Sequence, residues 1–413
     1  MKNRKLNQWL WKWHFIAGII ALPFVILLAI TGGIYLFKDT YDAPKQAHIK
    51  FVKAETDATA ISYQKQWELA KPQLQKPPFS MVLSTEKNQA TAFTSGMFSH
   101  KNSVYVNPYQ GKVIGKISPK DSNMYTVRKL HGELLLGTFG TKIIELIASW
   151  MFVLILTGIY VFWPSKKEGV KGLFKVRFKD GKRTLFRDLH TVLGFWISIL
   201  LVMILFGGMP WTDVFGANFK WVQKVTHTGF PKTWDARSLT SNKGETTITL
   251  DQMVALAQSM DLKGEVSIGL PANENGVYSI YNTTFNLNAQ KRFHFDQYSG
   301  EQLIHHNWED VGVLMQARMW FMAFHQGQFG TWNFILILGV ALLLIFVAIS
   351  ALIAYIKRKP SGKWGTPKVP ASFTVGYGVI TIIVLLGVIL PMFGISVILI
   401  VLFEFILKKI KRT

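Results

Sequence analysis

Four histidines stand at the start of long apolar runs and recur in matched contexts. His14 in "LWKWHFIAG" and His190 in "FRDLHTVLGF" are each followed by such a run and by a glycine four residues later. His131 in "LHGELLLGTFGT" and His325 in "FHQGQFGTWN" share a Phe-Gly-Thr sequence before another run. Neutral imidazole donates a nitrogen lone pair, and two imidazoles on different helices can bind opposite faces of one haem iron. Matched histidine pairs in an apolar bundle therefore indicate haem chemistry.

The elements that must position these histidines are membrane-spanning helices. A bilayer core of about 30 Å takes roughly 20 helical residues to cross. Apolar runs of that length lie near residues 15–37, 141–163, 190–210 and 332–356, and an apolar hairpin from about 373 to 408 turns at "LPMFG". The 413-residue chain is therefore expected to be an α-helical integral membrane protein with about six spans.

The basic residues indicate the orientation of the chain in the lipid bilayer. The net charge is +22, and residues 164–189 alone carry nine basic and three acidic residues. Residues 1–12 and 357–372 carry four and five basic residues and no acidic one. Short basic segments on one side of alternating spans follow the positive-inside rule, which places both termini in the cytoplasm. The charge is explained by topology, so a nucleic-acid partner is not expected.

The two long polar segments repeat one another. The stretches "VYVNPYQGKVIGKI" and "RFHFDQYSGEQLIHH" each read as a β-hairpin with glycine at its turn. Each follows a helical stretch, "ISYQKQWELAKPQL" or "TLDQMVALAQSM". Each segment is therefore expected to form an extracytoplasmic α+β module. The predicted fold is a duplicated unit of span, module and span, followed by a C-terminal transmembrane hairpin.

These features predict the following division of the chain. The parts are a cytoplasmic start and first span (1–37), module 1 (38–130), a second span with an outer histidine (131–163), a basic cytoplasmic loop (164–189), a third span (190–211), module 2 (212–324), a fourth span with an outer histidine (325–356), a second basic cytoplasmic loop (357–372), and the C-terminal hairpin with a basic tail (373–413).

The duplication places the histidines at two depths in the membrane. His14 and His190 begin spans that run outward and belong near the inner face, whereas His131 and His325 precede spans that run inward and belong near the outer face. This arrangement predicts two b-type haems, and the absence of cysteine removes covalent haem attachment and thiolate-held clusters. Taken singly, each histidine also fits a polar ring at the membrane interface.

Two arginines are candidates for neutralising haem propionates. Arg128 and Arg187 each precede a ligand histidine by three residues, which is one helical turn. The positive-inside rule offers an alternative explanation for Arg187 alone. Five further histidines fall in the outer modules and are expected to be solvated on the surface: His48, His100, His294, His305 and His306.

A polar and aromatic stretch after the third span, predicted to be a loop, is the candidate substrate contact. It supplies Trp211, Asp213, Trp221 and His227, which suit the lining of a pocket between the two modules on the outer side. An aromatic belt at the membrane surface is the alternative explanation for the tryptophans.

The sequence resembles the PepSY-associated transmembrane family, often described as iron-regulated membrane proteins, over roughly residues 5–358. The segments that carry the resemblance are "WKWHFIAGIIALPFVILLAITGGIYLF", "RKLHGELLLGTFGTKIIELIASWMFVLILTGIYVFWP", "RDLHTVLGFWISILLVMILFGGMPWTDVFG" and "AFHQGQFGT". The family includes a ferrisiderophore reductase of the bacterial inner membrane. The resemblance implies a di-haem protein that reduces iron on the periplasmic side, with haem ligation at the four matched histidines.

Electron transfer to an outer ferric chelate, such as a ferric siderophore, is the expected function. Fe(II) binds hard oxygen ligands less tightly than Fe(III), so reduction releases the iron. The glycines form no GxGxxG signature after a strand, so the electron donor must be a separate reductase, a quinol or a soluble reductant. Two alternatives stay open: a membrane module that binds or regulates an envelope protein, and a transporter. Both repeats begin in the cytoplasm, which argues against the transporter.

Overall fold

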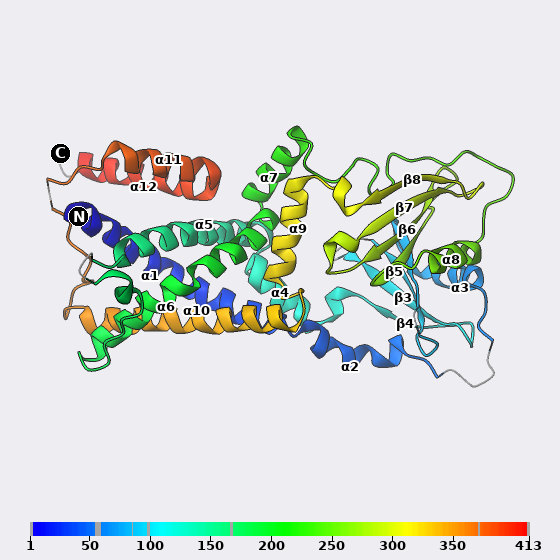
Figure 1. The fold of residues 1–413 in the computed structure, drawn as a ribbon, viewed down its shortest axis with the longest axis horizontal. Helices are drawn as coiled ribbons and strands as arrows, with labels where there is room; N and C mark the ends of the chain where they lie inside the picture. The colour runs from blue at the N-terminus through cyan, green and yellow to red at the C-terminus, as the bar shows by residue number, and fades with distance from the viewer. Residues whose placement is uncertain are drawn as a thin grey trace. The chain divides into compact units, whose positions relative to one another are not determined.

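The computed structural model describes residues 3–53, 59–84, 86–96, 100–165, 168–370 and 372–410. It forms two compact units, whose elements are labelled in Figure 1. The membrane unit comprises Met1–Leu36, Val127–Val222 and Phe321–Thr413, and the sheet unit comprises Phe37–Thr126 and Gln223–Trp320.

Among the described residues, four helices of the membrane unit are long and apolar enough to cross a bilayer. They are α1 (Arg4–Tyr35), α5 (Gly137–Phe162), α6 (Lys182–Gly208) and α10 (Thr331–Arg358). The four spans predicted before the C-terminal hairpin are confirmed as helices. Both α1 and α6 begin before their apolar runs, so some of the basic residues ahead of each run, such as Lys12 and Arg187, are already helical. The chain is a multi-pass membrane protein.

The four long helices pack as a bundle around small and branched side chains. Helix α1 packs against α5 and α10, and α6 packs against α10 and α5. One buried cluster contains Ala21, Val25 and Ile147, and another contains Ile197, Leu201, Val340 and Val347. Leu344 packs against both clusters, so α10 contributes to both halves of the bundle interior.

The outer histidines lie on short helices that precede the spans. Helix α4 (Asn123–Glu133) carries His131, and α9 (Val313–His325) ends at His325. Leu134 and Leu135 have φ of 50° and 59°, so the chain leaves the helical conformation between α4 and α5. The two histidines thus precede the spans, as predicted, and a left-handed turn separates each short helix from the span that follows it.

The C-terminal hairpin consists of α11 (Tyr377–Ile389) and α12 (Pro391–Ile410), which meet at the predicted turn. Proline opens the second helix because it lacks the backbone N–H that a helix interior requires. Trp150 on α5 donates a hydrogen bond to Ser396 on α12 at 3.1 Å. Helix α11 has 13 residues. At 1.5 Å per residue it is about 20 Å long, which is shorter than the bilayer core, so the fifth and sixth spans stay a prediction.

The described residues of the sheet unit form one antiparallel sheet of eight strands in the order β4-β3-β2-β1-β5-β6-β7-β8. The strands are β1 (Phe79–Val82), β2 (Thr91–Ser95), β3 (Asn102–Asn107), β4 (Lys112–Ile117), β5 (Glu265–Leu270), β6 (Val277–Thr283), β7 (Lys291–Asp296) and β8 (Gln302–Asn307). The predicted hairpins are confirmed as β3–β4 and β7–β8. Strand β1 pairs with β5, so the two predicted modules share one sheet and neither leaves that edge unpaired.

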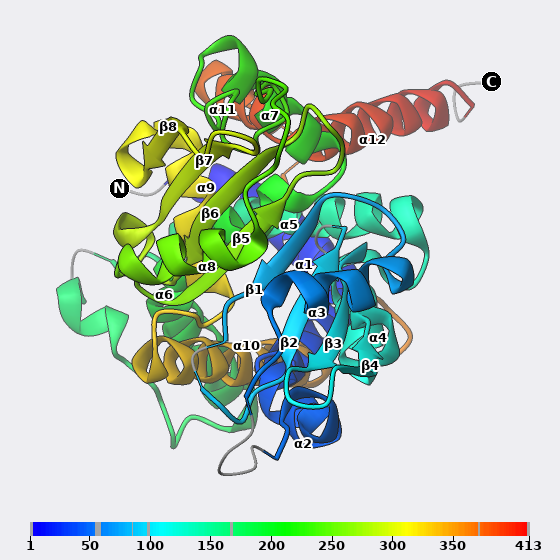
Figure 2. The ribbon, with the colours of Figure 1, turned by 90° about the vertical axis from the view of Figure 1, so that its right-hand side faces the viewer.

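Helices α3 (Tyr63–Ala70) and α8 (Leu250–Ser259) cover the same face of the sheet, as Figure 2 shows. Both helices were predicted from the sequence. Asp251 on α8 accepts hydrogen bonds from the backbone N–H groups of Tyr63 and Gln64 at 2.8 and 3.0 Å. This carboxylate therefore caps the start of α3 and joins the helices of the two sequence repeats.

Candidate functional site

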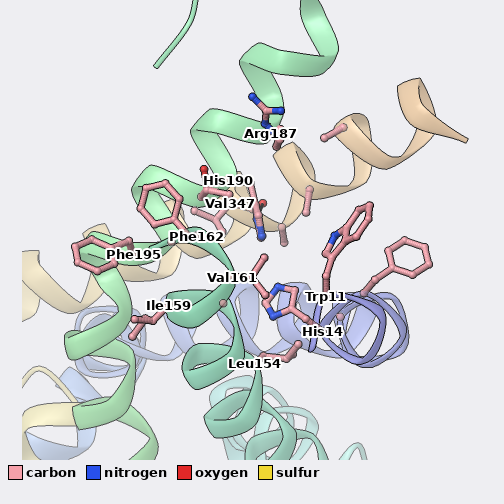
Figure 3. A pocket seen from close by; sticks show the side chains of 18 of the residues that line it. Trp11, His14, Leu154, Ile159, Val161, Phe162, Arg187, His190, Phe195 and Val347 are labelled. Carbon is pink, nitrogen blue, oxygen red and sulfur yellow. Dashed lines mark hydrogen bonds between the residues drawn. The ribbon is translucent and has the colours of Figure 1, made fainter. Parts of the chain in front are cut away.

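His14 on α1 and His190 on α6 face one another inside the membrane unit. Their ring centroids lie 6.3 Å apart, and the ring planes cross at 65°. Both rings line a cavity of about 630 Å³, part of which Figure 3 shows from close by. This volume lies within the range of about 300–1,000 Å³ that is usual for cofactor pockets.

The cavity beside this inner pair is apolar around the rings and charged elsewhere. Leu154, Ile159, Phe162 and Phe195 contribute apolar walls. The glycine at 158 allows close approach, because a Cβ there would lie 3.1 Å from Cε1 of His14. The charged lining consists of Lys175, Arg177, Arg183, Arg187 and Arg358 with Glu168 and Asp188. Apolar walls beside a lining of net positive charge suit a flat, apolar macrocycle that bears carboxylate groups, such as a porphyrin.

His131 on α4 and His325 on α9 form a second pair. Their ring centroids lie 6.1 Å apart, and the ring planes cross at 72°. Gly32 on α1 lies beside the first ring, where an added Cβ would be 3.1 Å from Cε1 of His131. An added Cβ at Gly207 on α6 would lie 2.6 Å from Cβ of His325. Glycines on two spans therefore let both outer rings enter the bundle.

Backbone carbonyls define the tautomer of two of the four rings. Nδ1 of His190 donates to the carbonyl of Val347 at 3.1 Å, and Nδ1 of His325 donates to the carbonyl of Ile204 at 2.8 Å. A carbonyl can only accept, so each Nδ1 carries the hydrogen. In the neutral ring, the lone pair is then on Nε2.

Threonine hydroxyls define the tautomer of the other two rings. Oγ1 of Thr157 lies 3.0 Å from Nδ1 of His14 and donates its own hydrogen to the carbonyl of Val153 at 2.7 Å. Oγ1 of Thr31 lies 3.0 Å from Nδ1 of His131 and donates to the carbonyl of Leu27 at 2.7 Å. Each hydroxyl oxygen therefore accepts from its imidazole N–H, which again leaves Nε2 available for a metal.

The spacing of the rings fits two imidazoles on one metal ion. A histidine nitrogen lies about 2 Å from the metal it binds, and its ring centroid lies about 1.2 Å further away, so opposed ligands have centroids about 6.3 Å apart. The measured separations are 6.3 and 6.1 Å. Two protein nitrogens complete a haem iron, whose other four ligands come from the porphyrin. The donor set at both pairs thus fits b-type haem.

The two pairs lie at different heights along α1. His14 is on this helix, and Thr31, which contacts His131, is 17 residues further along it. At 1.5 Å per residue this distance is about 26 Å, which approaches the thickness of a bilayer core. One histidine pair therefore lies near each end of the helix bundle.

The two predicted arginines occupy different surroundings. Arg187 lines the inner cavity and donates to Asp188 at 2.8 Å, and Arg177 donates to the same carboxylate at 2.8 Å. The side chain of Asp188 is only 5% exposed, so it fixes both guanidinium groups beside the cavity. Arg128 is half-buried on α4, one turn before His131.

Sequence reasoning missed Arg358 at the end of α10. Its guanidinium lies 5.1 Å from the ring of Trp11 and 5.0 Å from the ring of Phe15, and it donates to the carbonyl of Gly365 at 2.8 Å. It lines the same cavity as His14. In the sequence it is one of several cations in a basic loop, so no local pattern distinguishes it.

The predicted substrate residues are distributed over both units. Trp211 ends a short 3-10 helix, and Trp221 is 63% exposed on α7 (Val214–Val225). Asp213 forms an ion pair with Lys142 at 3.3 Å. His227 belongs to the sheet unit and has φ of 53°. The stretch was interpreted as a loop, but most of it is helical.

A buried carboxylate stabilises the start of α7. Glu145 on α5 is fully buried and accepts hydrogen bonds from the backbone N–H groups of Val214 and Phe215 at 2.8 and 2.9 Å. The first N–H groups of a helix lack partners within it, and a carboxylate there also meets the positive end of the helix dipole. Glu145 therefore has a structural role in the membrane unit.

The prediction that the five module histidines are solvated is wrong for two of them. His48, His100 and His305 are exposed, but His294 and His306 are buried. Alternation along β8 correctly predicts opposite faces for its adjacent histidines. His294 is fully buried because it faces the neighbouring strand, where Nδ1 lies 2.8 Å from Oγ of Ser279. A small hydroxyl partner on an adjacent strand cannot be recognised from the sequence alone.

Comparison with known proteins identifies the family of the chain. No curated protein is similar enough to the chain to count as a match. The family profile described as the PepSY-associated TM region matches residues 11–358, which include all four long helices except the first residues of α1. The chain therefore belongs to the PepSY-associated transmembrane family.

Proposed function

We propose that this chain is a di-haem b-type electron-transfer protein that reduces a ferric chelate, most simply a ferric siderophore, outside the bacterial inner membrane. The proposal rests on the geometry of the two histidine pairs. In each pair the rings have the separation expected for two ligands of one metal ion, and each of the four Nδ1 atoms has a hydrogen-bond partner. A haem bound at each pair supplies a one-electron couple within the bilayer.

The residues of the chain divide the work of holding these groups. His14 and His190 bind at the inner site, and His131 and His325 bind at the outer site. The apolar cavity walls exclude water, so that no water molecule forms a competing hydrogen bond to Nε2 of the neutral imidazoles. Arg187 and Arg358 are placed to neutralise the propionates of the inner group, and Arg128 those of the outer group.

The orientation in the membrane follows from charge. The basic stretch before α6 and the basic end of α10 contain side chains that line the cavity of the His14 pair, which supports a position near the cytoplasmic face for this pair. Both termini are then cytoplasmic, and the sheet unit is periplasmic. Membership of the PepSY-associated transmembrane family, which includes a ferrisiderophore reductase of the bacterial inner membrane, supports that membrane as the location.

The proposed reaction is a one-electron reduction of the chelated iron. A separate donor, a quinol or a reductase, gives one electron on the inner side, and Fe(III) in the outer chelate accepts one electron to become Fe(II). The oxygen ligands of the chelate hold Fe(II) less tightly, so iron is released. The exposed ring of Trp221 supports a contact with a bulky chelate, and Trp211 and Asp213 of the same unit are proposed as further contacts.

Spectroscopy of the purified chain tests the proposal directly. The oxidised and dithionite-reduced protein should show the bands of b-type haem, and a pyridine haemochrome assay should return about two haems per chain. The reduced protein should then be reoxidised by a ferric hydroxamate in stopped flow, whereas a His14→Ala, His131→Ala double variant should contain no haem to reoxidise.

Two outcomes would redirect the interpretation. A wild-type protein without haem would leave a membrane module that binds or regulates an envelope protein, or a transporter, which a liposome flux assay detects. A haem-loaded protein that no ferric chelate reoxidises would retain electron transfer but exclude the ferric substrate.

A further inference from the structure

The two sequence repeats support their histidines in different ways. In the first repeat, His14 and His131 each meet a threonine hydroxyl, which in turn donates to a carbonyl of its own helix. In the second repeat, His190 and His325 donate directly to a backbone carbonyl. In each pair, one imidazole therefore donates a hydrogen bond to a threonine hydroxyl, and the other donates to a backbone carbonyl.

Equivalent positions in the two repeats explain the difference at the inner pair. Val153 and Val347 follow His131 and His325 by 22 residues each, and they supply equivalent carbonyls. Thr157 follows His131 by 26 residues, and the residue 26 after His325 is Ala351. Without a hydroxyl at 351, the histidine bonds to the carbonyl itself.

The outer pair repeats the relationship. Thr31 and Gly207 follow His14 and His190 by 17 residues each. Thr31 donates to the carbonyls of Leu27 and Leu28, and Ile204 supplies the carbonyl equivalent to that of Leu28. A Cβ at Gly207 would lie 2.5 Å from the carbonyl oxygen of Phe321, so no hydroxyl-bearing side chain fits there.

We propose that Thr157 and Thr31 are positioning residues that orient His14 and His131 and tune the reduction potential of the group each histidine binds. The proposal rests on the haem binding proposed above. A hydroxyl that donates to a carbonyl becomes a better acceptor, so it holds the imidazole N–H more firmly than an isolated hydroxyl does. A hydrogen bond at Nδ1 raises the basicity of Nε2 and stabilises the ferric state.

The decisive variants are Thr157→Val and Thr31→Val, because valine keeps the branched shape and removes the hydroxyl. Redox titration followed by visible spectra should show a higher midpoint potential for one haem in Thr157→Val and for the other haem in Thr31→Val. Loss of the hydrogen-bond partner of a metal ligand typically changes metal affinity about tenfold or more. A tenfold change in the ratio of ferric to ferrous binding equals a shift of about 59 mV in the one-electron midpoint potential.

Serine and alanine replacements separate the hydrogen bond from packing. Thr157→Ser and Thr31→Ser keep the hydroxyl and should retain wild-type potentials. Thr157→Ala reproduces the second repeat, where Ala351 leaves the carbonyl accessible, so its potential should not rise. The electron paramagnetic resonance spectrum of the ferric protein provides a second readout, since it depends on the orientation of the two imidazole planes.

The outcomes distinguish this inference from the proposed function. A wild-type protein without haem overturns both. A haem-loaded wild type whose potentials are unchanged in both valine variants overturns only the role of the threonines. Equal rises in Thr157→Val and Thr157→Ser would assign the effect to packing, because serine keeps the hydroxyl, and would also overturn it. If a valine variant loses its haem while the serine variant keeps it, the hydroxyl is required and the inference is supported.

Discussion

His131 and His325 face one another with ring centroids 6.1 Å apart, although 194 residues separate them in the chain. They come from equivalent short helices of the two repeats, α4 and α9. The same relationship holds for His14 and His190 on α1 and α6, at 6.3 Å. Duplication thus provides each pair with one histidine from each repeat, and neither repeat alone can complete a pair.

Because the pairs are separate, single histidine replacements should remove haems selectively. His14→Ala and His190→Ala should each deplete the same haem, and His131→Ala should deplete the other, so the His14→Ala, His131→Ala double variant should lose both. Haem content by pyridine haemochrome measures the losses. His305→Ala, at an exposed position, is the matched control and should retain about two haems. A double variant that keeps one haem would show that the two residues share a site.

The crossed rings predict a characteristic magnetic signature. The ring planes cross at 65° and 72°, far from parallel. Low-spin ferric haem with nearly perpendicular imidazole planes gives a strongly anisotropic electron paramagnetic resonance spectrum with one large g value. Parallel planes instead give a rhombic spectrum. A rhombic spectrum from the purified wild type at low temperature would contradict the arrangement of both pairs.

Arg358→Gln should weaken haem binding at the inner site. The guanidinium lines the inner cavity, and a hydrogen bond to a charged group contributes about 1.5–3 kcal/mol. Its loss should therefore raise the dissociation constant of the inner haem about tenfold or more, as measured by haem transfer to apomyoglobin. Arg237→Gln removes an exposed arginine that pairs with Asp235 and should leave transfer unchanged. Equal transfer rates in the two variants would remove Arg358 from the site.

Glu145→Gln should destabilise the first turn of α7. The carboxylate accepts two backbone N–H bonds, whereas an amide offers one oxygen and places an NH₂ group against the other N–H. The cost of a buried donor left without a partner is about 1–3 kcal/mol. Hydrogen–deuterium exchange of the full chain should become faster at Val214 and Phe215 and stay the same in α3. Unchanged protection at those two amides would contradict this capping role.

The sheet unit should lose stability as the pH falls below the ordinary range of histidine. Burial, with the nearby Arg292 guanidinium and His306, lowers the pKa of His294 to about 4. The unfolded chain has a histidine pKa of about 6.5, so this group favours folding fully above pH 6.5, and the contribution is lost as the pH falls toward 4. The loss amounts to about 3 kcal/mol at most.

Hydrogen exchange in β6, β7 and β8 measures this effect in the full chain. After correction for intrinsic rates, protection should fall between pH 6.5 and 4 in the wild type. His294→Asn keeps a polar group near Ser279 without a titration in this range, so its protection should depend less on pH. His48→Asn, at an exposed position, is the control and should behave like the wild type.

The sequence by itself determined the elements and their repetition. Apolar runs, hairpin turns and helical periodicity predicted the four spans, the hairpins β3–β4 and β7–β8, and helices α3 and α8, because these features depend on local composition and spacing. The histidines were paired by depth, which follows from counting spans. These inferences required no knowledge of which surfaces meet.

Only the tertiary structure decided how the equivalent halves meet. The pairing of β1 with β5, the burial of His294 against Ser279 and the stacking of Arg358 on Trp11 all join residues that are distant in sequence or are not distinguished by a local pattern. The same holds for Thr157 and Thr31. A threonine in an apolar helix usually satisfies its hydroxyl on its own backbone, and only the approach of a histidine from another helix gives that oxygen a second partner.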